Sequence, residues 1–321
     1  MARVELTRTR RKPVPLAALE AAPAESRSRP IFVLGIDRSG TSLLSEIVFH
    51  WGAYAGDPAL LGAPDEGNPQ GYWEYRPMQE LVSELLMGAG VSPWDPGFKE
   101  QVRQCAFDPR YRDKALAMIS EMQAADRPWL WKEPNFAFTL PFWRELVPDP
   151  VCLVTLRNPY HSAKSYEKFI LPPALKGQVH LVAYFFLRWQ YFMNTVIAEL
   201  KTVRSKLFIP YEALLSSPAE QCARICRFLD TEFAGTDGDR AERVGRMTQV
   251  VNPDLWRNTS PVPFSEAPES SAEQRALYSY LSSRLAGDIN DFDPSQYPLP
   301  PCWREYMSNI GLIRRLLESL E

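Results

Sequence analysis

The chain has few of the residues that build metal centres, with 3 histidines and 5 cysteines in 321 residues. Cys222 and Cys226 lie one helical turn apart, but no histidine or second cysteine pair accompanies them, so we expect buried apolar thiols. No cluster of Asp, Glu or His at ligand spacing occurs either. An odd cysteine count without a secretion signal favours reduced thiols. These scarcities predict a cytoplasmic chain without a bound metal.

Long apolar runs and an excess of basic charge are also missing. No run reaches the roughly 18–20 uninterrupted apolar residues of a membrane span. The N-terminus is basic, as in a signal peptide, but its best apolar piece, Leu16 to Leu19, is shorter than the about 7–15 residues of a signal core. A net charge of −3 excludes a global basic field for nucleic acid. We therefore expect a flexible tail over residues 1–29, and neither a membrane span nor a nucleic-acid partner.

The most informative segment is an apolar run that ends in a glycine turn and continues as a helix-like pattern, over residues 31–44. Gly35 and Gly40 have the spacing of the two glycines of a nucleotide-binding P-loop, but Thr41 replaces its lysine. We expect the turn to bind a phosphate through backbone N–H groups and the side chains of Arg38, Ser39, Thr41 and Ser42. The lysine that contacts the β- and γ-phosphates of ATP is missing.

Short apolar runs alternate with helix-like segments along the rest of the chain, which predicts an α/β fold. We expect a three-layer, P-loop-like domain with a central parallel sheet flanked by helices, as a single domain over 30–300, and an amphipathic helix over 301–321. The predicted strands are 31–36, 129–132, 151–156 and 207–210. The predicted helices begin near Thr41, Met78, Asp113, Phe138, Tyr160 and Ala219, and a long helix rich in core aromatics spans 180–200.

Two segments rich in proline interrupt this alternation. Residues 57–77 form a long irregular segment after the first helix, and long loops in compact domains are often functional. Ligands of open α/β sheets bind beyond the carboxyl ends of the strands, within reach of such a loop. A second irregular stretch, 251–270, could act as a lid.

An apolar strand followed by Arg-Ser-Gly-Thr-Ser and Leu-Leu resembles the 5′-phosphosulfate loop of sulfotransferases, which use 3′-phosphoadenosine 5′-phosphosulfate (PAPS). Arg157 ends a predicted strand and Ser165 follows eight positions later, which is similar to the 3′-phosphate site of that family. Tyr211 lies in a segment similar to the family's Y-E-x-L motif and would lie near the nucleotide. Arg257, in a weaker match to the C-terminal nucleotide loop, would contact the 3′-phosphate.

Two further matches concern catalysis. Lys132-Glu133-Pro134 resembles the K-D-P segment of the tyrosylprotein and bacterial branches, which implies that Lys132 contacts the bridging oxygen or the sulfonate. Pro134 stands where cytosolic sulfotransferases carry their catalytic histidine, so we expect a carboxylate as general base. Glu74 is the first candidate, because Gly71-Tyr72-Trp73-Glu74 resembles the G-Y-[WF]-E segment of bacterial relatives. Glu66 is the second and His161 the third.

The ordered matches, from about residue 31 to 260, imply a PAPS-dependent O-sulfotransferase without a metal. The resemblance implies in-line transfer to a carbohydrate or natural-product hydroxyl, with Arg38 and Lys132 supplying positive charge. Two other classes stay open: a kinase-like phosphotransferase that uses ATP, and a non-catalytic nucleotide-binding module. The missing lysine and the Arg157/Ser165 pair argue against the first. The presence of Arg38, Lys132 and Arg157 argues against the second. The acceptor and the oligomeric state are not defined by the sequence.

Overall fold

The computed structural model describes most of the chain. The described residues are 29–91, 93, 95, 97–147, 149–169, 179–233, 239–253, 262–301, 303–305 and 307. The tail predicted over 1–29 lies outside these residues except for Arg29. Arg257 and most of the helix predicted over 301–321 also lie outside them.

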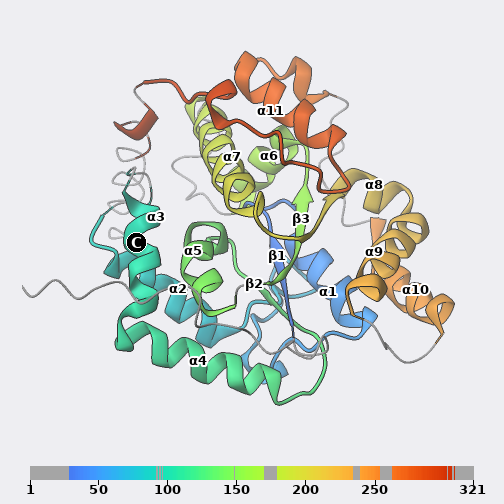
Figure 1. Cartoon of the computed structure of the whole chain (residues 1–321). Coiled ribbons are helices and arrows are strands. Elements are labelled where there is room, and N and C mark those ends of the chain that lie inside the picture. Colours follow the sequence, from blue (N-terminus) through green and yellow to red (C-terminus); the bar gives the residue numbers. More distant parts are fainter. Residues whose placement is uncertain are drawn as a thin grey trace, which may run out of the picture.

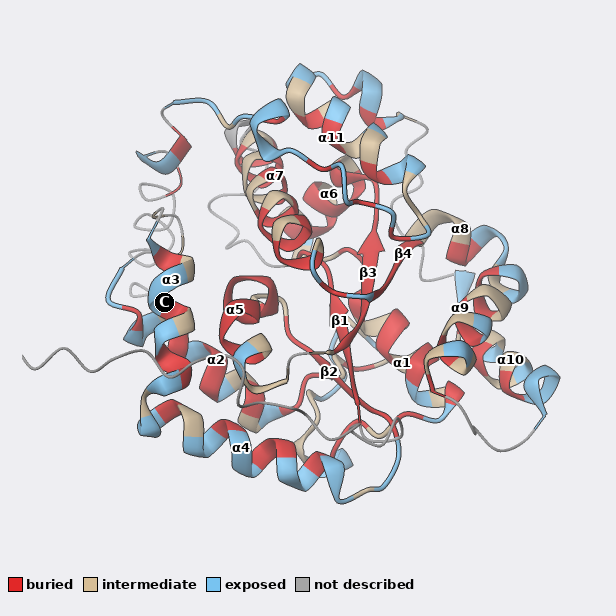
Figure 2. Ribbon diagram, viewed as in Figure 1, coloured by how far each residue is buried: buried red, intermediate tan, exposed pale blue. Residues whose placement is uncertain are grey.

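The centre of the molecule is a four-stranded parallel sheet in the order β2-β1-β3-β4. The strands are β1 (Pro30–Leu34), β2 (Trp129–Lys132), β3 (Val151–Leu156) and β4 (Ser205–Pro210). Every residue of β1, β2 and β3 is buried, as expected for parallel strands covered on both faces. Figure 2 shows the sheet as the most continuously buried part of the fold. The predicted parallel sheet is confirmed.

Helices cover both faces of the sheet, which confirms the three-layer architecture (Figure 1). One face packs against α1 (Thr41–Trp51), α8 (Tyr211–Ser216), α9 (Pro218–Glu232) and α10 (Arg240–Gln249). The other face carries the remaining α-helices, namely α2 (Arg76–Gly88), α3 (Phe98–Gln104), α4 (Pro109–Gln123), α5 (Phe136–Leu146), α6 (Pro159–Phe169), α7 (Val179–Leu200) and α11 (Ala272–Ser283). Alternate strand residues supply the two cores: Ile31 and Val33 face the first, Phe32 and Leu34 the second.

The predicted element starts agree with the structure to within a few residues. The main difference at the site is the end of β1, which we expected at Ile36 and which lies at Leu34. The backbone turns earlier because the Ser39 N–H donates to the Ile36 carbonyl (3.1 Å). The sequence reading did not predict α3, α8, α10 and α11 as separate helices. The aromatics of α7 are core residues, as expected, with Phe185, Phe186 and Trp189 fully buried.

An aromatic cluster holds β2, the edge strand of the sheet next to β1, against α5. Trp131 makes edge-on contacts with Trp129 (4.6 Å between ring centroids) and Trp143 (5.1 Å). Phe136 stacks on Trp143 and packs against Phe32 of β1. Buried aromatic side chains of this size contribute strongly to core stability. The cluster therefore fixes the position of Lys132, the last residue of β2.

Among the described helices, none is both long and apolar enough to cross a membrane. Within the segment predicted as a C-terminal helix, Trp303 and Met307 are buried against Tyr184 of α7. Cys222 and Cys226 are both buried free thiols, as the sequence predicts, and the Cys226 thiol also contacts the Asp230 carboxylate (3.7 Å).

Candidate active site

A cleft lies where the strands end, and it brings together most of the residues that the sequence singles out. Its wall is contributed by the turn after β1, the irregular segment before α2, the end of β2, and the segments that follow β3 and β4. The predicted site residues that line it are Arg38, Gly40, Thr41, Ser42, Glu74, Lys132, Arg157, Ser165 and Tyr211. Parallel strands place these separate segments at one edge of the sheet.

The turn after β1 is held by short contacts with β3. The Ser39 hydroxyl donates to the Ile36 carbonyl (2.6 Å) and shares a hydrogen bond with Thr155 (2.7 Å). A side chain at Gly35 would overlap the Thr155 hydroxyl, at 2.1 Å from its added Cβ. Ser39 is buried and is not among the cleft residues, so its hydroxyl serves the turn in this structure.

Gly40 precedes α1 in a left-handed conformation, with φ of 95°. Its missing side chain leaves room for the Tyr211 ring, which a Cβ would meet at 2.2 Å. The first backbone N–H groups of α1, beginning at Thr41, have no acceptor within the helix and carry the positive end of its dipole. Together with Ser42, whose hydroxyl also donates to the Tyr72 carbonyl (3.3 Å), they suit a bound phosphate.

The Arg38 guanidinium crosses the cleft. Its Nε donates to the Ser165 hydroxyl (3.0 Å) and an Nη donates to the Gly67 carbonyl (2.9 Å). Its carbon lies 5.1 Å from the Phe169 ring centroid. Burial lowers the pKa of Arg38 from its ordinary value. The cation is thus partly stripped of water. Its hydrogen bonds within the described chain go to neutral groups, while Asp37 and Asp65 act on it only through their charge, so a directly bound anion would stabilise it.

Arg157 lies beside it, buried, and supports the same turn. One Nη donates to the Arg38 carbonyl (2.7 Å), and the guanidinium carbon lies 4.5 Å from the Tyr211 ring centroid. The Arg157 Nε is buried and has no hydrogen-bond partner among the described residues. Burial lowers the pKa of Arg157 too. An unpartnered donor on a buried cation is the kind of group that a ligand phosphate satisfies.

Lys132 and Glu74 form a buried ion pair on the other side of the cleft, with 2.5 Å between Nζ and Oε1. Only 2% of the Lys132 side chain and 11% of the Glu74 side chain are exposed. The second carboxylate oxygen of Glu74, Oε2, accepts a hydrogen bond from the Gln79 amide (2.5 Å). The Tyr72 ring flanks the lysine at 5.9 Å from Nζ.

The other candidate bases lie elsewhere. Glu66 is exposed and is not among the cleft residues. His161 is buried on α6, with its Nδ1 3.4 Å from Glu212, and does not line the cleft either. Glu74 alone among the three reaches both the cleft and Lys132. The contacts therefore favour Glu74 for a proton-accepting role.

The irregular segments flank the cleft. Gln70 donates to the Val250 carbonyl (3.0 Å), so the segment before α2 contacts the residue that precedes the stretch 251–270, which we considered as a lid. Near the middle of that stretch, the Val262 carbonyl accepts a hydrogen bond from Asn158 (3.2 Å). Arg257 lies between these contacts, outside the described residues, and its predicted role remains a prediction.

Sequence reasoning did not single out three contributors to the site. Asp37 lines the cleft and forms an ion pair with Arg188 of α7, which is distant in sequence. Gln79 binds Glu74 from the first turn of α2. No motif marks Arg188 or Gln79. The signal that could have pointed to Gln79 is its helical position just after a candidate base, where an amide can reach back.

The cleft offers several hydrogen-bond donors to an anionic ligand. Arg38, Arg157 and the α1 N-terminus offer donors to phosphate oxygens, and Tyr211 offers an aromatic face. Among the described residues no group of three or more His, Cys, Asp or Glu side chains has the arrangement of a metal site.

Comparison with known proteins gives one family match. The sequence model of the sulfotransferase family matches residues 30–235. No curated protein matches the chain significantly.

Three solved structures are distantly similar to the chain. Sulfotransferase STF9 from Mycobacterium avium has 15% identity, covers 85% of this chain and 78% of its own, and has a TM-score of 0.42. Sulfotransferase STF1 from Mycobacterium tuberculosis H37Rv has 16% identity, coverages of 78% and 76%, and a TM-score of 0.42. Retinol dehydratase in complex with androsterone and inactive cofactor PAP has 16% identity, coverages of 86% and 83%, and a TM-score of 0.34.

Proposed function

The chain belongs to the sulfotransferase family, and we propose that it moves the sulfonate group of PAPS to an acceptor hydroxyl. The observation that carries the proposal is the cleft itself, in which one half-buried and one buried guanidinium group, those of Arg38 and Arg157, and a lysine–carboxylate pair face one space. Sulfonate transfer needs those components: an anion site for the donor, a cation beside the reacting group, and a base for the acceptor.

The donor would occupy the side of the cleft between β1 and β3. We assign the 5′-phosphosulfate to Arg38, Gly40, Thr41 and Ser42, where backbone N–H groups and a guanidinium converge. Arg157 and Ser165 would hold the 3′-phosphate, the group that distinguishes this nucleotide from ADP and ATP. Arg157 lines the cleft and forms no ion pair with a carboxylate among the described residues, which supports that assignment. Tyr211 packs beside both and would contact the nucleotide.

The chemistry would take place at the Lys132–Glu74 pair. Glu74 takes the proton of the acceptor hydroxyl as the oxygen forms its bond to sulfur. The bond from sulfur to the bridging oxygen breaks, and its electron pair stays on the departing phosphate, where Lys132 and Arg38 stabilise the negative charge. PAPS supplies the sulfonate and the leaving group. As in phosphoryl transfer, positioning and electrostatics would provide most of the rate enhancement.

The acceptor would enter past Tyr72 and Phe169, which give the cleft aromatic walls. Such walls suit the ring of a sugar or of an aromatic natural product. We propose a small-molecule or glycan acceptor.

Isothermal titration calorimetry with 3′-phosphoadenosine 5′-phosphate (PAP) tests the donor assignment. We expect PAP to bind without magnesium, and ADP, which lacks the 3′-phosphate, to bind at least about tenfold more weakly, the loss expected for one charged hydrogen bond. Preference for ATP with magnesium would instead support a kinase-like enzyme. Absence of any nucleotide binding would support a non-enzymatic role, and either result would overturn the proposal.

A further inference from the structure

The Glu74 carboxylate is held from two sides by two different kinds of donor. Lys132 binds Oε1 with a charged ammonium, and Gln79 binds Oε2 with a neutral amide, both at 2.5 Å. Lys132 lines the cleft, whereas Gln79 does not. One donor can therefore be reached by a ligand, and the other lies behind the carboxylate.

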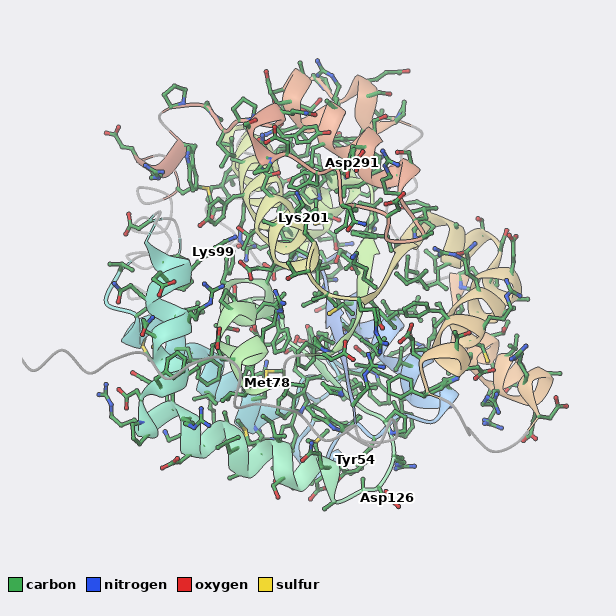
Figure 3. All side chains as sticks on the ribbon, in the orientation of Figure 1. Tyr54, Met78, Lys99, Asp126, Lys201 and Asp291 are labelled. Atoms are coloured by element: carbon green, nitrogen blue, oxygen red, sulfur yellow. The ribbon has the colours of Figure 1, made fainter. Side chains whose placement is uncertain are left out.

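Gln79 is well anchored for this contact. It lies in the first turn of α2, directly after Met78, which is fully buried and is labelled within the packed side chains of Figure 3. Leu81, Val82 and Leu85, further along the same helix, are also buried. Because the backbone is fixed, the amide is held at a defined place relative to Glu74. Glu74 also precedes the N-terminus of α2, where the helix dipole favours negative charge.

The two donors would behave differently when the donor substrate arrives. Lys132 would turn toward the incoming sulfonate, and this leaves Oε1 free beside the place where the acceptor must lie. A buried carboxylate that loses its charged partner favours its protonated form, and a protonated Glu74 could not act as a base. The other titratable groups around it do not compensate: Glu133 and Asp37 are acidic, and the Tyr72 hydroxyl donates to Asp65.

We propose that Gln79 is a positioning residue that keeps Glu74 ionised, with Oε1 directed at the acceptor, once Lys132 has moved to the sulfonate. The inference rests on the proposed role of Glu74 as base. It assigns the two oxygens different tasks: Oε2 stays bound to Gln79 throughout, and Oε1 passes from Lys132 to the acceptor proton.

The inference can be measured without knowing the acceptor. When PAPS binds to a Gln79→Leu variant, Glu74 loses both donors and takes up a proton from the buffer, whereas the wild-type carboxylate stays ionised. Calorimetric titration with PAPS in two buffers of different ionisation enthalpy gives the number of protons taken up. Between pH 6 and 7.5 we expect Gln79→Leu to take up more protons than the wild type when PAPS binds.

Three further variants make the result specific. Gln79→Glu keeps the shape and places a second acid beside Glu74, so it should also take up extra protons. Combining Gln79→Leu with Glu74→Gln should abolish the extra uptake, because the accepting carboxylate is gone. Gln104→Leu is the matched control, since Gln104 makes the same kind of bond to Glu100 (2.6 Å) on α3, away from the cleft.

The outcomes separate the two proposals. Equal proton uptake by the wild type and both Gln79 variants, with PAPS binding intact, would overturn the role of Gln79 and leave the proposed function standing. Extra uptake that persists in the double variant would assign the proton to another group and would also overturn it. Failure of the wild type to bind PAPS would overturn the proposed function and this inference together.

Discussion

The two sides of the cleft use their cations in opposite ways. On the side that we propose for the donor, Arg38 and Arg157 contact hydroxyl and carbonyl groups and aromatic rings, and neither forms an ion pair with a carboxylate within the described chain. On the acceptor side, Lys132 is neutralised by Glu74. The donor side thus has positive charge to offer an anion at once, whereas the acceptor side becomes reactive only after its own pair separates. The difference suggests an order, in which the donor binds first and releases the base.

The largest effect on turnover is expected for a substitution on the acceptor side, at Glu74. Glu74→Gln removes the proposed base and should lower the turnover of PAPS with an accepted substrate by about 10²–10⁴-fold. PAP affinity should change little, because the nucleotide lies on the other side of the cleft. Turnover measured against a panel of sugars and phenols, with PAP titrations, checks both. Glu66→Gln is the matched comparison from the same segment, and loss of turnover there alone would move the base to Glu66.

On the donor side, Arg38→Ala should lower turnover by about 10²–10³-fold, because a cation is removed from the place where negative charge develops. The fold should remain, since Arg38 extends into the cleft and no core packing depends on it. Circular dichroism checks the fold and single-turnover kinetics the rate. Normal rates in a correctly folded variant would contradict the assignment.

A smaller effect separates the two anion sites within the donor side. Arg157→Ala should weaken PAP binding by about 10–100-fold, the value of one or two charged hydrogen bonds, while ADP binding changes less. Arg157 also supports the Arg38 carbonyl, and Ser162, which donates to the same oxygen (3.3 Å), provides the control. Ser162→Ala loosens the turn without removing a cation. If it weakens PAP binding as much, Arg157 acts through the turn and not on the 3′-phosphate.

The smallest effect concerns stability. Burial, with a smaller contribution from the neighbouring Glu74, raises the pKa of Glu133 to about 8. The folded state holds this proton more tightly than the unfolded chain, so the contribution of Glu133 to the free energy of unfolding falls as pH rises from 4.5 toward about 8. Relative to the wild type, Glu133→Gln should therefore gain roughly 4 °C or more in Tm between pH 5 and 8.

Thermal unfolding followed across that pH range measures the difference. Glu220→Gln, on the exposed side of α9, serves as the control and should show no such trend. A constant difference between Glu133→Gln and the wild type would mean that Glu133 does not carry the proton.

The difference between the two sides of the cleft also explains which parts of the site could be predicted from the sequence. The proposed donor side depends on short segments that follow β1 and β3, so apolar runs and the spacing of Gly35, Gly40, Arg157 and Ser165 were enough to predict which segments meet in the cleft. The acceptor side depends on side chains that meet across 58 positions, as in the Lys132–Glu74 pair. A resemblance placed each residue of that pair, but the contact between them is a property of the fold. Arg188 carries no motif and could not have been found without the structure, and Gln79 is marked only by its helical position just after a candidate base.

The Ser39 hydroxyl shows in detail where prediction from the sequence reaches its limit. From the sequence, its position in the turn predicts phosphate binding as well as the positions of Thr41 and Ser42 do. Only the packing of β1 against β3 directs it to Thr155 and away from the cleft. Residue type gives the chemistry that is available, and tertiary contacts decide where that chemistry is used.

Trp73 gives the site a fluorescent side chain. It lies between Tyr72 and Glu74, which both line the cleft, and it adopts a left-handed backbone conformation with φ of 58°. Its ring packs beside Phe49 of α1 (4.9 Å between centroids), the helix whose first turn lines the cleft at the proposed phosphate site. The indole therefore packs against α1 on one side of the cleft and is the sequence neighbour of Glu74 on the other side. Its fluorescence, isolated by subtracting a Trp73→Phe variant from the wild type, should report in real time when each substrate arrives.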